Sequence, residues 1–141
     1  MKVALTAWED RISPVFGSAR TLLIADVENA EVVARRYALI NPESIFGLDK
    51  MLKDLKIDVL ICGAISRTPS DIIEAGGIRL ISFIGGDLEE VLESFAKGER
   101  IVPAFLMPGC ARNFRKRKRR RDGFFEIKEE VNTMPNRDGT G

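Results

Sequence analysis

Apolar and polar residues follow two different periods along residues 1–100, and the changes of period predict where strands and helices lie. Alternating or continuous apolar runs predict five strands, over residues 2–7, 21–27, 31–39, 57–62 and 78–84. Apolar residues at helical spacing predict three helices, over residues 42–55, 68–75 and 88–97. The chain is therefore expected to fold in the order βββαβαβα.

Residues that favour turns and helix ends support these boundaries. Asn41 is expected to cap a helix that begins at Pro42, and Asp87 is expected to cap the last helix. The pair Gly76–Gly77 is expected to end the second helix. Asn29 suits a left-handed turn between the second and third strands.

The order of the elements predicts a three-layer α/β/α sandwich around a five-stranded mixed sheet. Three strands without intervening helices favour an antiparallel meander, whereas the later strand–helix–strand units favour parallel strands with right-handed crossovers. If the first strand is central, its carboxyl end and that of the fourth strand flank a topological switch point, where α/β proteins bind ligands. Residues 7–20, 62–67 and 84–87 would meet there.

Composition fits one folded domain with an extension. Of the 141 residues, 45% are hydrophobic and 30% are charged. Because no apolar stretch reaches the roughly 20 residues of a membrane span and no signal-peptide pattern is present, we expect a cytoplasmic protein without a membrane segment. Residues 1–102 are expected to fold, and the charged, turn-rich residues 103–141 to form a flexible basic tail.

Soft-metal chemistry in this chain depends on thiolates, because the sequence has no histidine and two cysteines. Cys62, followed by Gly63, ends the fourth predicted strand, where it is either a small buried residue or a ligand at the switch point. Cys110 precedes a basic run that would lower the pKa of its thiol. A disulfide between the two is not expected in the cytoplasm. Since an iron–sulfur cluster takes four protein ligands, the two thiolates would need a homodimer or a cluster that carries its own sulfide.

Several polar residues at the switch point are candidates for holding an anion. Arg11 and Arg67 could form charge-assisted hydrogen bonds, and Ser13 lies in a loop that can present backbone N–H groups. Gly85 and Gly86 precede a helix amino terminus, although Asp87 could cap that terminus and repel an anion. An ordered turn without a ligand explains these residues equally well.

Several segments of the chain resemble a known family. Residues 1–5, the segment Arg11–Ala19 (RISPVFGSA), residues 48–55 and 57–63, and the helix after Gly85–Gly86 are together similar to the dinitrogenase iron-molybdenum cofactor biosynthesis family. This family includes NifX, NifY and the carboxy-terminal domain of NifB. The resemblance covers residues 1–100 and implies a ribonuclease-H-like fold. It also implies non-catalytic binding or carriage of an iron–sulfur or molybdenum-containing cluster or its precursor, alongside cluster-assembly proteins.

The sequence departs from the family at the start of the first helix. Many relatives carry histidines there, whereas the segment Asn41–Gly47 of this chain has none. The ligand role would then pass to Cys62, or another protein would complete the ligand set. A catalytic function is not expected, because the first strand contains no carboxylate and a general base active at neutral pH would have to be an unusual Glu, Lys or Cys.

A basic run supports an alternative function, the binding of nucleic acid or of an acidic partner. Residues 1–111 contain 12 Lys or Arg against 16 Asp or Glu, whereas residues 112–121 contain eight basic residues and no acidic one. Such a run binds phosphates through counterion release. The candidate partner-binding residues are Arg112, Arg115, Lys116, Arg117, Lys118, Arg119, Arg120 and Arg121.

Overall fold

The structure is a computed structural model that describes residues 1–41, 43–102 and 104–108. Its strands are β1 (Lys2–Trp8), β2 (Arg11–Ile12), β3 (Thr21–Glu28), β4 (Glu31–Leu39), β5 (Val59–Ile61) and β6 (Arg79–Ile81). Its α-helices are α1 (Ile45–Asp54), α2 (Arg67–Ala75) and α3 (Leu88–Ala96), and a 3₁₀ turn, η1, covers Phe16–Ser18. The fold described below is that of the unit Met1–Met107.

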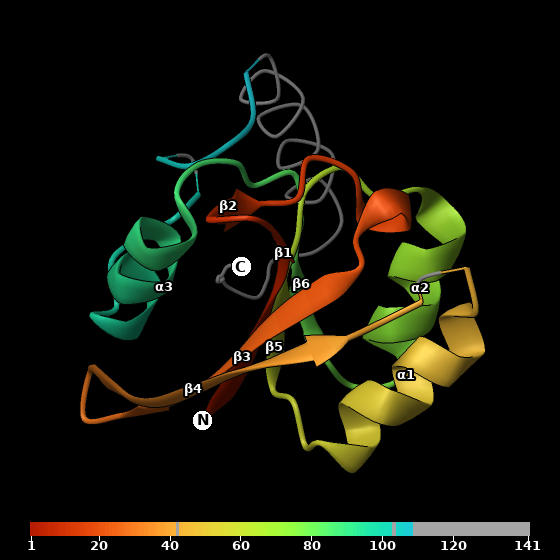
Figure 1. The fold of residues 1–141 in the computed structure, drawn as a ribbon, viewed down its shortest axis with the longest axis horizontal. Coiled ribbons are helices and arrows are strands. Elements are labelled where there is room, and N and C mark those ends of the chain that lie inside the picture. Colours follow the sequence, from red (N-terminus) through yellow and green to blue (C-terminus); the bar gives the residue numbers. More distant parts are fainter. Residues whose placement is uncertain (42, 103, 109–141) are drawn as a thin grey trace, which may run out of the picture. The chain divides into compact units, whose positions relative to one another are not determined.

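The sheet is mixed and has the strand order β4-β3-β1-β5-β6 (Figure 1). Strands β1, β3 and β4 pair antiparallel, and β5 pairs parallel with both β1 and β6. The predicted meander and the central position of the first strand are therefore confirmed.

The predicted number of strands is wrong, because the sheet also contains β2. This short strand pairs antiparallel with the end of β1, so that Ala7 lies opposite Ile12. Glu9 has a φ of 57° in the two-residue turn between the two strands. A pair of residues is too short to show a hydrophobic period, and this explains why the pattern of the sequence did not reveal the strand.

Alternation along the strands divides the core into two layers, one on each face of the sheet. Val3 and Leu5 of β1 pack with Val91 and Leu92 of α3. Ala4, on the opposite face of β1, belongs to the cluster that contains Leu52 of α1 and Ile73 of α2. Figure 1 shows α3 on one side of the sheet and α1 with α2 on the other. The predicted three-layer arrangement is present.

The first helix begins later than the sequence predicts. Asn41 does not cap it; instead, the side-chain Oδ1 of Asn41 accepts a hydrogen bond from the backbone N–H of Glu43 at 3.1 Å. This local turn competes with helix formation, and α1 begins at Ile45 after Ser44. Pro42 lies outside the described residues.

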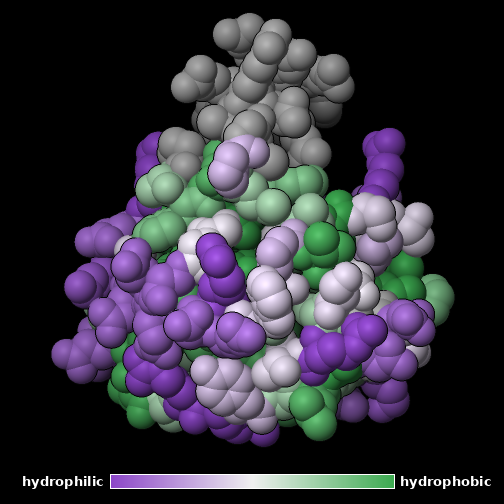
Figure 2. All heavy atoms as spheres, turned by 45° about the horizontal axis from the view of Figure 1, so that its top comes forward, coloured by the Kyte–Doolittle hydropathy of each residue, from purple (hydrophilic) through white to green (hydrophobic). Residues whose placement is uncertain are grey.

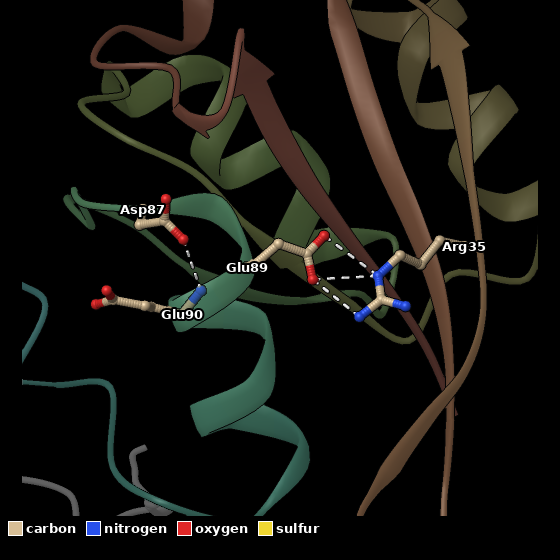
Figure 3. Close-up of polar contacts among 4 residues, drawn as sticks. All are labelled: Arg35, Asp87, Glu89 and Glu90. Carbon is tan, nitrogen blue, oxygen red and sulfur yellow. Dashed lines mark hydrogen bonds and ion pairs between the residues drawn. The ribbon is translucent and has the colours of Figure 1, made fainter.

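The other predicted helix boundaries agree closely with the structure. Helix α2 ends at Ala75, and Gly77 follows with a φ of +92°. At the start of α3, Asp87 Oδ2 accepts a hydrogen bond from the backbone N–H of Glu90 at 3.0 Å (Figure 3). The predicted cap of the last helix is therefore confirmed. Asn29 has a φ of 54°, as expected for the turn between β3 and β4.

An ion pair that the sequence did not predict links the outer strand of the sheet to α3. Arg35 of β4 donates hydrogen bonds to the Glu89 carboxylate, from Nη2 at 2.8 Å and from Nε at 3.2 Å (Figure 3). Both side chains are partly exposed, so solvent screens this pair. Among the described residues, no helix is both long enough and apolar enough to cross a membrane.

Candidate binding cleft

Loops from three regions of the chain meet beyond the carboxyl ends of the parallel strands. The backbone N–H of Phe16 donates to Ala64 O, and the N–H of Ala64 donates to Pro14 O, both at 2.8 Å. On the other side, Ile12 N–H donates to Gly86 O at 3.0 Å. The three segments predicted to meet at the switch point are therefore connected by backbone hydrogen bonds.

A cleft of about 490 Å³ lies between η1 and the first residues of α1 and α2. Its lining is mostly apolar and consists of Val15, Phe16, Gly17, Glu43, Ile45, Ala64, Ile65, Ser66 and Pro69. A second cleft, of about 250 Å³, is lined by Trp8, Ser13, Pro14, Val15 and Ser18. Val15 is 48% exposed and borders both spaces. The larger space, named the α1–α2 cleft below, is a pocket of the size that small ligands occupy.

The surface around these clefts combines polar and apolar areas. In Figure 2, hydrophilic residues crowd the left of the molecule, on the side of α3, while hydrophobic residues interrupt the polar surface in the upper part and on the right. Exposed apolar side chains include Trp8, which is 55% exposed, and Phe46, which is 73% exposed. Phe16, by contrast, is buried in the core.

Two helices begin at the α1–α2 cleft without a side-chain cap. Neither Ser44, before α1, nor Ser66, before α2, accepts a capping hydrogen bond with its hydroxyl group. The first turn of each helix also contains no acidic residue. Since the first backbone N–H groups of a helix carry a partial positive charge, this end of the cleft favours an anion.

Cys62 has the environment of a core residue. It is fully buried in the cluster beneath α1 and α2, and burial raises the pKa of its thiol to about 12. A thiol with this pKa is protonated at neutral pH, whereas metals bind the thiolate. The described residues contain no group of three or more His, Cys, Asp or Glu placed to hold a metal ion. The ligand role of Cys62 stays a prediction.

Ser13 and Gly63 form the junction beneath the smaller cleft. Ser13 is buried; its N–H donates to Thr6 O at 2.9 Å and its Oγ donates to Val15 O at 3.1 Å. A Cβ atom on Gly63 would lie 2.3 Å from Ser13 O and 2.5 Å from Pro14 O. Only glycine fits this approach, so the requirement for Gly63 is steric.

Arg11, Gly85 and Gly86 lie in a second junction, which faces α3. Gly85 N–H already donates to Phe105 O at 2.8 Å, and Gly86 has a φ of +116°. The backbone of Arg11 pairs with Asp87 in an isolated bridge. None of these three residues lines either cleft, so the structure does not bring them together with the α1–α2 cleft.

Arg67 is the predicted anion-binding residue that lies beside the α1–α2 cleft. It follows Ser66 at the start of α2, and its side chain is 93% exposed and 3.9 Å from Asp71 Oδ2. Cys110 and the predicted partner-binding run 112–121 lie outside the described residues. Their roles, including the alternative of nucleic-acid binding, stay predictions.

Sequence reasoning predicted the region of the cleft but named none of the residues that line it as candidates. Six of the nine lining residues belong to the segments 7–20 and 62–67, which were predicted to meet at the switch point. Glu43, Ile45 and Pro69 lie outside those segments, and no short motif connects them with the other six. The signal in the sequence that could have pointed to the lining is the apolar Val15 inside a polar loop.

Comparisons with solved structures support the fold. The protein PH0822 has a TM-score of 0.64 and 24% identity, with 70% of this chain and 91% of that chain covered. The protein mj0327 from Methanocaldococcus jannaschii gives 0.57 and 25%, covering 70% and 90%. The orange protein from Desulfovibrio gigas, solved in its apo form, gives 0.56 and 20%, covering 70% and 88%.

The sequence itself was also compared with family models and with curated proteins. No curated protein matches it. The model of the family described as dinitrogenase iron-molybdenum cofactor matches residues 1–98, which is more than half of the chain and agrees with the resemblance carried by the RISPVFGSA segment. The chain therefore belongs to the dinitrogenase iron-molybdenum cofactor family.

Proposed function

We propose that this protein binds and carries, without catalysis, an iron–sulfur or molybdenum-containing cluster or its precursor. The proposal places it in the cytoplasm, on a fold of the ribonuclease-H-like type, where it exchanges this cargo with cluster-assembly proteins. Membership of the family supports a role tied to the metal cluster. The observation that carries the proposal is the α1–α2 cleft, which opens at the carboxyl ends of parallel strands.

The chemistry of the cleft suits an anionic cluster that brings its own sulfide. Apolar walls from Val15, Ile45 and Ile65 would exclude water from the faces of the cargo. The uncapped amino termini of α1 and α2 would stabilise its negative charge, as helix amino termini do for other anions. Arg67, at the start of α2, is proposed to add a charge-assisted hydrogen bond.

The thiolate part of the proposal rests on Cys110, because Cys62 is buried and protonated.

A carrier function also agrees with the kinds of side chain around the cleft. General acid–base catalysis needs a positioned group with a pKa near the working pH. The described lining offers Glu43 as its one ionisable group.

Anaerobic purification from a host supplied with iron and molybdate tests the proposal. Metal content, acid-labile sulfide and the visible spectrum are measured for the full chain and for Val15→Glu. Val33→Glu is the matched control, because Val33 is 54% exposed and lies on β4, outside both cleft linings. We expect the wild type and Val33→Glu to retain metal and sulfide in constant ratio, and Val15→Glu to lose both.

Three further outcomes decide the details. Protein that stays free of metal and sulfide, even after anaerobic reconstitution, would refute the carrier function. Equal retention by Val15→Glu and Val33→Glu would move the site away from the cleft. Loss of the spectrum in Cys110→Ser, but not in Cys62→Ser, would assign the thiolate ligand.

A further inference from the structure

The α1–α2 cleft carries one feature that opposes the binding of an anion. Of the nine residues that line it in the described part of the chain, Glu43 alone has an ionisable side chain. Its neighbours in the lining are apolar, apart from the hydroxyl of Ser66 and the backbone of Gly17. A carboxylate in this position repels the same cargo that the two helix amino termini attract.

The position of Glu43 is fixed by local hydrogen bonds. Its backbone N–H donates to Asn41 Oδ1 at 3.1 Å, and the N–H of Ser44 donates to Asn41 O at the same distance. These two bonds close a turn immediately before α1, so the chain holds Glu43 at the cleft rather than leaving it in a free loop. The ion pairs seen among the described residues involve other carboxylates, namely those of Asp26, Asp49, Asp54, Asp71 and Glu89.

We infer that Glu43 is an electrostatic brake, which weakens the hold of the cleft on an anionic cargo and speeds its release. This inference rests on the proposed function and adds its regulation. A carrier must release what it binds. Glu43 is exposed, so solvent screens its charge, but a carboxylate in the lining of the cleft still repels a dianion by enough to change an off-rate several-fold.

A structural role gives a different expectation for the same residue. A carboxylate just before α1 also interacts favourably with the helix dipole, and that interaction would stabilise the helix without affecting cargo. Replacement of Glu43 by Gln would then lower the unfolding midpoint slightly and leave binding unchanged. Binding and unfolding must therefore be measured on the same variants.

The test uses the full chain, with tetrathiomolybdate as the probe, a molybdenum–sulfur dianion. Its dissociation constant and off-rate are measured anaerobically from its visible spectrum, for the wild type, Glu43→Gln, Glu31→Gln and Val15→Glu. The unfolding midpoint of each protein is measured by thermal melts. Glu31 is an exposed residue of β4, so Glu31→Gln makes the same change in net charge away from the cleft. Any contribution from the basic residues 112–121 is common to all four proteins.

We expect Glu43→Gln to bind the probe about fivefold more tightly, with most of the gain in a slower off-rate, and Glu31→Gln to match the wild type. Equal or weaker binding by Glu43→Gln, with Val15→Glu still abolishing binding, would overturn the brake and leave the proposed function intact. An equal gain in Glu43→Gln and Glu31→Gln would also overturn it, because the effect would then come from net charge. Absence of binding in the wild type and Glu43→Gln would overturn the brake. Together with purified protein that stays free of metal and sulfide, it would also refute the proposed function.

Discussion

Two helices follow parallel strands in this fold, and their amino termini differ sharply. Helix α3 begins with Asp87, which caps it, and its first turn contains Glu89 and Glu90. Helix α2 begins after Ser66 with no side-chain cap and no acidic residue in its first turn. The positive end of α3 is thus neutralised by its own side chains, whereas that of α2 faces a cleft.

This difference shows how one architecture separates stability from binding. Both connections lie at the edge where α/β proteins bind ligands, so position alone does not choose between them. The sequence of the first turn distinguishes the two helix starts, because a carboxylate at a helix start occupies the position that an external anion would need. The connection from β5 to α2 is therefore the better candidate for binding.

The largest expected effect comes from the glycines that begin the two connections. Gly63→Ala places a methyl group against the backbone of Ser13 and Pro14, so we expect a loss of about 3 kcal/mol or more in the free energy of unfolding. Among the described residues, a methyl group in Gly85→Ala meets only the side chain of Met107, at 3.5 Å, and the substitution is expected to cost less than about 1 kcal/mol. Urea denaturation measures both, and equal losses would contradict the comparison.

The buried thiol below the β5–α2 connection predicts a dependence on pH. Because the pKa of Cys62 rises from 9.0 to about 12 on folding, the unfolded chain loses this proton first. The stability that the raised pKa of Cys62 contributes is therefore fully present below pH 9. Above pH 9 the free energy of unfolding falls by about 1.4 kcal/mol per pH unit, up to pH 12. Urea melts at pH 8 and pH 10 are expected to show about 1.4 kcal/mol more loss in the wild type than in Cys62→Ala. A parallel decline in the two proteins would show that Cys62 ionises in the native state.

The caps themselves can be compared by alanine substitution. Asp87→Ala removes the hydrogen bond from Glu90 N–H and is expected to cost about 1 kcal/mol. Ser66→Ala removes a hydroxyl that makes no capping bond, so its effect on unfolding is expected to stay below about 0.5 kcal/mol. Equal destabilisation by the two substitutions, measured by thermal and urea melts, would mean that α2 is capped in solution.

The smallest expected effect on stability comes from giving α2 the cap of α3. Ser66→Asp is expected to stabilise the protein by about 0.5 kcal/mol, since aspartate accepts from the first N–H groups and interacts with the helix dipole. The same substitution should weaken tetrathiomolybdate binding, because the carboxylate occupies the anion's place. If stability rises and binding is unchanged, the amino terminus of α2 takes no part in holding the cargo.

Most of the fold could be predicted from the spacing of apolar residues and from the residues that favour turns and helix ends. Most long strands and helices have an apolar stripe that matches their burial, as in β1, where Val3 and Ala4 face opposite layers. The outer strand β4 is an exception, because none of its residues is buried. The errors lie where local hydrogen bonds compete with the helix, as at Asn41, or where pairing is tertiary, as in β2. The site was harder, because residues chosen for their chemistry, such as Ser13, direct their polar groups inward. Its walls are apolar residues that sequence patterns assign to packing.

Two backbone hydrogen bonds, from Phe16 to Ala64 and from Ala64 to Pro14, affect how fast cargo binds. They are named the backbone clip here. Both hydrogen bonds of this clip form within the folded chain, so two walls of the cleft exist before any cargo arrives. These loops lose their conformational entropy during folding, so their ordering does not reduce the free energy of binding. Association should therefore follow a single exponential whose rate rises linearly with cargo concentration, with no slow phase from loop closure.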